Sequence, residues 1–285
     1  MPSSRYLVGV AGWSYADWEG IVYPPGKGDR LVEVARLFDA IEVNTSFYHP
    51  VAHRTMSSWM KRIEPLPGFR FAVKLWQRFT HDAEPFGKEE IDAVLPALNL
   101  VQSEGRLGAL LIQFPYSFKN VSGVRGRLAR ILDAFAAFPC VVEIRHASFD
   151  VPGFYGHLRE RRVGFCNIDQ PLISQSIHPT AVATSGVGYV RLHGRNYKEW
   201  FREGADVASR YDYYYKPEEL QEWTERIGEI GRETESVYII ANNHYRGQAV
   251  ANGLRLKSMI NGRKIEVPSG LLDAFPDLHE ISAAG

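Results

Sequence analysis

This chain has few cysteines and no formal net charge. Its 285 residues include two cysteines, Cys140 and Cys166, and each lies in or beside an apolar run with no second cysteine nearby. This pattern argues against disulfides and for two small core residues in a protein of the reducing cytosol. The 33 basic and 33 acidic residues cancel, so the overall charge favours neither nucleic acid nor an anionic membrane. Any preference for an anion must be local.

Long apolar runs and glycine-rich fingerprints are missing as well. No run of apolar residues is long enough to span a membrane, and residues 1–6 lead into a strand-like segment without the apolar stretch of a signal peptide. We therefore expect a cytoplasmic protein without membrane contact, and nothing implies a protein partner. Residues 9–14 (GVAGWS) lack the glycine spacing of a dinucleotide- or phosphate-binding loop, so no nucleotide cofactor is predicted.

Apolar extended segments recur eight times along the chain. They lie near residues 7–11, 40–47, 69–75, 108–114, 140–146, 163–168, 189–193 and 237–242. Most intervals between them have helical spacing, which favours parallel strands closed into a (β/α)8 TIM barrel. We predict one α/β domain over residues 1–285, with its core at about 6–262 and a C-terminal tail at 263–285. An open doubly wound sheet is the alternative.

The helices are predicted from apolar periodicity and end signals. They are expected at 31–38 after Asp29 as a cap, at 89–104, at 121–138, from Pro217 onward, and at 248–260. Proline, serine and threonine dilute any period between residues 169 and 188. We expect mostly loop there, and hence an irregular sixth βα unit.

Charged residues occur inside the short apolar strands. Residues 40–46, 141–146 and 189–194 alternate aliphatic with polar side chains, which places the two kinds on opposite faces of a strand. In a closed barrel covered by helices, the polar faces would converge on the interior. They carry Glu42, Asn44, Glu143, Arg145, Arg191 and His193. Burying unpaired charge is costly, so this cluster must be paired, solvated or bound to a ligand.

Polar residues also mark the ends of all eight predicted strands, where barrel enzymes carry their chemistry. The residues that we expect to bind a substrate there are Trp13, Ser14, Glu42, Asn44, Tyr48, Lys74, Gln113, Arg145, His146, Arg191, Asn242, Asn243 and His244. The alternative is that Glu42 and Glu143 pair internally with Arg145, Arg191 and Lys74 and join the strands without a ligand.

The inward set of charges favours an anionic ligand. With Lys74 at the end of its strand included, three basic residues (Lys74, Arg145 and Arg191) against two acidic ones (Glu42 and Glu143) leave one surplus positive charge, which a phosphate or carboxylate would balance. Arg145 and Arg191 would hold the anion, because a guanidinium donates two parallel hydrogen bonds. His193 is the candidate general acid or base, oriented by Glu143 or Asp169, and a structural histidine is the alternative.

A metal site is not identified by the sequence. Glu42, Glu143, Asp169, His193 and His244 could supply ligands for a divalent metal, but no short ligand spacing is present. His49 and His53 are interpreted as surface loop residues, because Pro50 lies between them and no glutamate follows His49 as in a zinc-binding helix.

Aromatic residues gather after the first and seventh strands. The first loop has Trp13, Tyr15 and Trp18, and the seventh has Tyr197, Trp200, Phe201, Tyr211, Tyr213, Tyr214 and Tyr215 among Arg195, Lys198, Arg202 and Arg210. Such a loop could stack bases or sugars and contact phosphates above the barrel mouth. Packing of a long loop onto the barrel is the alternative.

Several of these segments together resemble the YecE-like family, a bacterial and archaeal domain of unknown function numbered seventy-two. They are residues 9–15 with Trp18, 42–48, 71–74, 113–115, 143–146, 189–194 and 242–244. The resemblance implies a single TIM barrel with a pocket built from these segments. More remotely, this barrel is similar to those of endonuclease four and the xylose isomerases, whose histidine-rich metal sets this chain does not reproduce.

Three functional hypotheses follow. The first is an enzyme that binds an anionic, phosphate-bearing ligand, with hydrolysis of a phosphodiester in nucleic acid or a nucleotide as the candidate reaction. The second is a non-catalytic nucleic-acid- or metabolite-binding protein, which would bind in a salt-sensitive manner without turnover. The third is a sugar isomerase, epimerase or lyase, which would turn over an unphosphorylated carbohydrate.

Overall fold

The computed structural model describes residues 5–26, 28–197 and 211–283. Eight parallel strands form a closed barrel in chain order, and the last strand pairs with the first. The strands are β1 (Arg5–Ala11), β2 (Ala40–Val43), β3 (Arg70–Lys74), β4 (Leu107–Gln113), β5 (Cys140–Glu143), β6 (Gly164–Asp169), β7 (Val187–Leu192) and β8 (Ser236–Ala241). The predicted (β/α)8 TIM barrel is therefore confirmed. β2 ends earlier than its apolar run because Asn44 adopts helical backbone angles.

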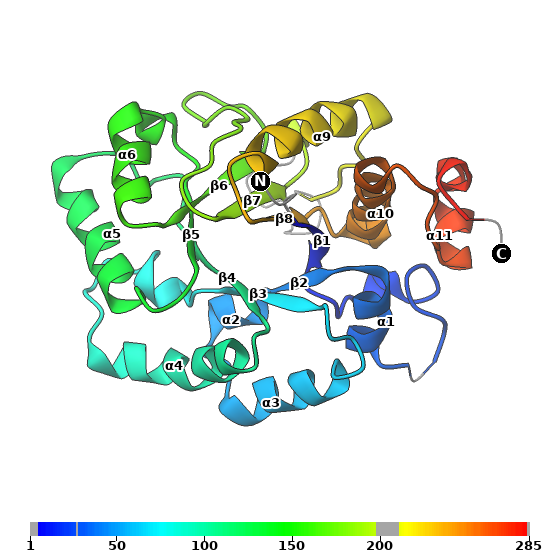
Figure 1. Ribbon diagram of the computed structural model, residues 1–285, viewed down its shortest axis with the longest axis horizontal. Coiled ribbons are helices and arrows are strands. Elements are labelled where there is room, and N and C mark those ends of the chain that lie inside the picture. The colour runs from blue at the N-terminus through cyan, green and yellow to red at the C-terminus, as the bar shows by residue number, and fades with distance from the viewer. Residues whose placement is uncertain (1–4, 27, 198–210, 284–285) are drawn as a thin grey trace.

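Helices surround the barrel on every side in the ribbon view (Figure 1). The α-helices are α1 (Arg30–Leu37), α2 (Thr45–Tyr48), α3 (His53–Arg62), α4 (Lys88–Ser103), α5 (Ser122–Ala134), α6 (Pro152–Glu160), α9 (Pro217–Gly231), α10 (Gln248–Asn261) and α11 (Ser269–Ala274). Short 3-10 helices are η1 (Ala16–Trp18), η2 (Gln77–Phe79), η3 (Ala147–Phe149), η4 (Tyr245–Gly247) and η5 (Pro276–Glu280). None of these helices is long and apolar enough to cross a bilayer, a finding that covers only the described part of the chain.

The ends of the helices follow the predicted signals. The Asp29 carboxylate accepts hydrogen bonds from the backbone N–H groups of Leu31 and Val32, which caps α1. Pro217 occupies the first turn of α9, where its missing N–H costs nothing. His49 and His53 are exposed, as predicted for surface residues, although His53 begins α3 rather than lying in a loop.

The sixth βα unit is irregular, as predicted, because residues 170–186 contain no helix. The buried amide of Asn167 organises this loop instead. Its Oδ1 accepts hydrogen bonds from Val182 N at 2.8 Å and Thr180 Oγ1 at 2.7 Å, and its Nδ2 donates to Val182 O at 3.0 Å. Side-chain hydrogen bonds thus take the place that helical ones hold in the other units.

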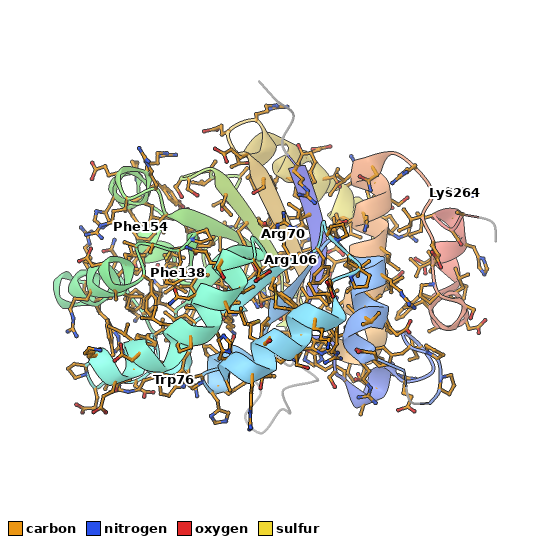
Figure 2. The ribbon with its side chains drawn as sticks, turned by 60° about the horizontal axis from the view of Figure 1, so that its bottom comes forward. Arg70, Trp76, Arg106, Phe138, Phe154 and Lys264 are labelled. Atoms are coloured by element: carbon orange, nitrogen blue, oxygen red, sulfur yellow. The ribbon has the colours of Figure 1, made fainter. Side chains whose placement is uncertain are left out.

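Two arginines lie at the amino end of the barrel, beside β3 and β4. At the amino end, Arg70 and Arg106 both donate hydrogen bonds to Phe69 O at 3.1 Å. Figure 2 labels these two arginines next to each other and Trp76, which follows the carboxyl end of β3, well away from them. Gly9 allows β1 to approach β2 closely, since a Cβ there would lie 2.2 Å from Ala40 O.

Both cysteines and the C-terminal segment pack into the protein. Cys140 and Cys166 are free and buried, as predicted for core residues. In the C-terminal segment, Leu271 of α11 and Leu278 of η5 are fully buried. Arg255 of α10 holds this segment through Asp277 Oδ2 at 2.6 Å and Glu280 Oε2 at 3.2 Å.

Candidate functional site

A cavity of about 590 Å³ opens among the loops that follow the strands. This volume is within the range of small-molecule sites. Ten of the predicted site residues line it: Trp13, Ser14, Asn44, Tyr48, Lys74, Gln113, Arg145, Arg191, Asn242 and His244. Its other lining residues are Gly12, Tyr15, Thr45, Phe47, Trp59, His81 and Tyr211. The cavity therefore draws on segments that are far apart in the sequence.

Two carboxylates and an arginine lie buried beneath this cavity. The Arg191 side chain, 1% exposed, donates from Nη2 to Glu42 Oε1 at 2.6 Å and from Nη1 to Glu143 Oε2 at 2.5 Å. Tyr189 also donates its hydroxyl to Glu42 Oε2 at 2.9 Å. The fork of Arg191 is thus occupied by two glutamates, which is the internal pairing considered above. We accordingly interpret Arg191 as a structural ion rather than an anion clamp.

Glu143 is the centre of the buried network. It accepts a further hydrogen bond on Oε1 from Arg145 Nε at 3.0 Å. Burial alone would raise the pKa of Glu143, but the guanidinium groups of Arg191 and Arg145 hold it well below its ordinary value. Glu143 therefore remains a carboxylate and lacks the proton that a general acid would need at neutral pH.

His193 is fully buried and does not line the cavity. Its Nε2 lies 3.3 Å from Glu143 Oε1, and its Nδ1 lies 2.9 Å from Asn242 Nδ2. The tautomer that suits both contacts carries the proton on Nε2 and accepts from Asn242. Burial, together with the charge of Arg145, lowers the pKa of His193 to about 3, so the ring is neutral. These surroundings are those of a residue that positions its neighbours Glu143 and Asn242.

Asp169 lies on the other side of the barrel wall. Its carboxylate accepts hydrogen bonds from Arg195 Nε at 3.0 Å and from Trp223 Nε1 of α9 at 2.7 Å. His193 N donates a backbone hydrogen bond to Asp169 O at 2.9 Å. The His193 ring itself contacts Glu143 and Asn242, and these two residues orient it.

His146 and Asn243 do not line the cavity either. His146 Nδ1 accepts a hydrogen bond from Ser148 N at 3.1 Å, which caps η3. Asn243 Nδ2 donates to Tyr213 O at 2.6 Å and so holds the loop after β7. Both residues shape the loops around the mouth but do not line it.

Lys74 is the cation of the cavity that no carboxylate holds. Its Nζ lies 3.8 Å from the centre of the Phe47 ring, and within the described chain no hydrogen bond or ion pair of this amine is found. Burial is the main reason that the pKa of Lys74 falls to about 7, and Arg191 and Arg145 lower it further against the opposing effect of Glu42 and Glu143.

Aromatic side chains form the walls. Trp13 meets Trp59 of α3 edge to face, with ring centres 4.9 Å apart. Tyr15 stacks on His244 at 4.5 Å with an angle of 11° between the rings. Burial lowers the pKa of His244, and its Nδ1 has no hydrogen-bond partner among the described residues. The walls therefore suit a flat or sugar-like group with hydrogen-bonding edges.

Trp59 and His81 were not found by sequence reasoning. Both line the cavity, yet Trp59 belongs to a helix and His81 follows η2, so neither stands at a strand end. A tryptophan on an amphipathic helix is typical of core packing, and only the tertiary contact with Trp13 distinguishes Trp59.

The aromatic loop after β7 is described in part. Tyr211 lines the cavity, whereas Arg195 binds Asp169 and Glu219 and Tyr215 is buried. These contacts show packing of the loop onto the barrel. The expectations for Lys198, Trp200, Phe201, Arg202 and Arg210 concern residues outside the described ranges.

A metal does not fit the donors that the structure presents. Across residues 5–26, 28–197 and 211–283, no three histidine, cysteine, aspartate or glutamate side chains are grouped to hold an ion. The candidate carboxylates of Glu42, Glu143 and Asp169 are each bound by an arginine. We therefore derive no step through a metal.

The fold and the cavity define a TIM-barrel protein with a ligand-sized site at the carboxyl ends of its strands. A family model described as "Protein of unknown function DUF72" matches residues 7–274, so the chain belongs to the DUF72 family. This result confirms the resemblance noted from the sequence.

Individual relatives agree with this membership. The UPF0759 protein YunF of Bacillus subtilis is 28% identical over 292 residues, which cover 94% of this chain and 99% of YunF. A crystal structure of a DUF72 protein from Thermotoga maritima superposes with a TM-score of 0.82 at 30% identity, covering 90% of this chain and 99% of that one. A DUF72 structure from Enterococcus faecalis, at 22% identity and a TM-score of 0.79 over 93% and 97% of the two chains, shares the fold.

Proposed function

We propose that this protein is an enzyme that binds a small anionic ligand, most simply a phosphate-bearing one, in the cavity at the barrel mouth. The observation that carries this proposal is the charge of the lining. Lys74, Arg145 and Arg191 contribute to it, and no aspartate or glutamate does among the described residues. The two arginines are paired with buried glutamates, so the surplus positive charge belongs to Lys74.

The walls supply a second recognition element. Trp13, Tyr15 and Trp59 present ring surfaces that can pack against a base or a sugar, while the charged amine of Lys74 binds its phosphate. A nucleotide or a sugar phosphate is thus the ligand class that we propose. For phosphodiester hydrolysis, the candidate bases in the lining are His81 and His244, because burial lowers the pKa of each and leaves the rings neutral near pH 7.

Binding of matched ligand pairs tests the proposal. Titrations of tryptophan fluorescence with ribose 5-phosphate and AMP are expected to show binding, and ribose and adenosine should bind at least about tenfold more weakly, since a charge-assisted hydrogen bond contributes about 1.5 to 3 kcal/mol. Equal affinities with and without phosphate would contradict the proposal. Release of 4-nitrophenol from bis(4-nitrophenyl) phosphate would report phosphodiester hydrolysis in the same samples.

Replacing Lys74 with methionine is expected to weaken binding of the phosphate ligands by roughly 10- to 100-fold, the value of one charge-assisted contact. Lys74→Met should remain folded, because the buried amine is held at a pKa far below its ordinary value and its removal relieves that cost. The matched control is Lys88→Met, whose side chain is 85% exposed on α4. Unchanged affinity in Lys74→Met would remove Lys74 from the anion site.

The affinity for a phosphate ligand is also expected to depend on pH. Lys74 has a pKa of about 7 in the free protein, so its charge is present below pH 7 and lost as the pH rises through that value. We expect affinity to fall by about tenfold between pH 7 and pH 9, within the range of one lost charged contact. In Lys74→Arg the guanidinium stays charged, so the fall should disappear. A fall of the same size in both proteins would assign the titration to another group.

A further inference from the structure

The amine of Lys74 combines access with the lack of a counterion. It stands at the carboxyl end of β3, lines the cavity and lies against the face of Phe47. Lysines that serve to bind carboxylates have an acceptor oxygen beside the amine. Within the described chain Lys74 has none, while both arginines of the same cavity do. An amine placed in this way is free to react with a ligand.

We propose that Lys74 is a nucleophile whose uncharged amine condenses with the carbonyl group of an anionic ligand in the cavity, such as the open-chain form of a phosphorylated sugar. This inference rests on the proposed function, since the charged form of Lys74 attracts the anionic ligand and the neutral form of the same amine attacks the carbonyl group. It narrows the substrate class to anionic aldehydes and ketones.

The condensation needs no oxidant or metal. The Nζ lone pair attacks the carbonyl carbon to form a C–N bond, and the carbonyl π electrons move to oxygen, which takes up a proton. The nitrogen loses a proton, and the resulting carbinolamine expels its hydroxyl group as water after protonation. The product is a protonated imine that joins Nζ to the ligand carbon, and one water molecule is released.

The surroundings of Lys74 favour the neutral amine that this attack requires. The charged groups that face it are Arg191 and Arg145, which lower its pKa, and Glu42 and Glu143, which raise it. Both glutamates are already paired with arginines, and burial adds to the lowering. At a pKa of about 7, roughly half of the amines are neutral at pH 7. An exposed lysine with a pKa of about 10.4 has fewer than about one in a thousand neutral.

A neutral imidazole lines the same cavity for the proton transfers. Burial and the neighbouring charge of Lys74 lower the pKa of His81 to about 4. His81 Nδ1 lies 2.8 Å from Thr80 Oγ1, which fixes the ring, and the ring meets Phe47 edge to face at 5.0 Å. Phe47 thus contacts both Lys74 and His81. We assign His81 to accept the proton that the nitrogen loses after attack and to pass it to the hydroxyl group of the carbinolamine, which then leaves as water.

The test uses pyridoxal 5′-phosphate as an anionic aldehyde, trapped with sodium cyanoborohydride at pH 7. Peptide mapping by mass spectrometry is expected to show Lys74 modified on the order of 100-fold faster than Lys88, whose side chain is 85% exposed, because about half of the Lys74 amine is neutral at pH 7, although a less basic amine is also a weaker nucleophile. Labelling of Lys74 no faster than Lys88 would overturn the inference. Lys74→Arg should lose the adduct at position 74 and the visible absorbance of the imine.

A matched ligand separates this inference from the proposed function. Pyridoxine 5′-phosphate carries the same phosphate and ring but an alcohol in place of the aldehyde, so it can bind without condensing. Its binding to the wild type and to Lys74→Arg, combined with no faster labelling of Lys74 by the aldehyde, would refute the nucleophile alone. Failure of pyridoxine 5′-phosphate, ribose 5-phosphate and AMP to bind would refute the anion site itself.

Discussion

Replacement of Arg191 by methionine is expected to lower the free energy of unfolding by about 3 to 5 kcal/mol, the usual effect of breaking a buried ion pair from one side. The substitution leaves Glu42 and Glu143, both fully buried, without the cation that contacts each of them. Methionine fills much of the same volume, so a cavity adds little to the loss. Urea unfolding followed by circular dichroism measures the effect.

The triple variant Arg191→Met, Glu42→Gln and Glu143→Gln serves as the control. It removes the uncompensated charges together with the arginine, so we expect it to recover more than half of the lost stability. Lys88→Met at an exposed ion pair should change stability by about 0.5 kcal/mol or less. A loss below about 1 kcal/mol in Arg191→Met would show that water or neighbouring groups compensate the glutamates.

Replacement of Trp18 by alanine is the second large effect, with an expected loss of about 3 to 5 kcal/mol for a buried tryptophan. Trp18 is fully buried in η1, packs on Tyr15 at 4.7 Å, and donates from Nε1 to His244 O at 2.7 Å. The indole therefore joins the loop after β1 to the loop after β8. Its loss should also disturb the Tyr15–His244 stack that forms one wall of the cavity.

The companion variant Trp18→Phe separates the contribution of the apolar contact from that of the hydrogen bond. Phenylalanine keeps most of the apolar contact but cannot donate to His244 O, so we expect a loss of about 1 to 2 kcal/mol from the orphaned carbonyl and smaller ring. Denaturant unfolding gives the stability of each variant. Titration with ribose 5-phosphate shows whether the change in the cavity wall alters ligand affinity. Equal stability of Trp18→Ala and the wild type would show that the two loops are held by other contacts.

The alternation of side chains along the strands predicted much of the site. In β2 and β7 it placed Glu42 and Arg191 on inward faces, and the structure joins them at 2.6 Å. The same rule, applied to β6, separates Cys166 from Asp169. The charges of Glu143 and Arg191 inside the barrel act on the pKa of Cys166. Asp169, by contrast, accepts a hydrogen bond from Trp223 of α9 outside the barrel. The prediction that Asp169 could orient His193 rested on the position of Asp169 at a strand end and did not take the alternation of side chains into account.

The barrel, its irregular sixth unit and the convergence of charge on its interior could be predicted from the amino-acid sequence, because strand alternation and helical periodicity are local properties of the chain. Which of those charges cancel depends on contacts that form in the folded protein. Glu143 meets Arg145 from its own strand end and Arg191 from β7, and Lys74 is left with an aromatic ring beside its amine. Trp59 and His81 join the cavity from outside the strand ends. Pairing and pKa depend on distances between segments that are remote in the sequence, so no local pattern could have assigned them.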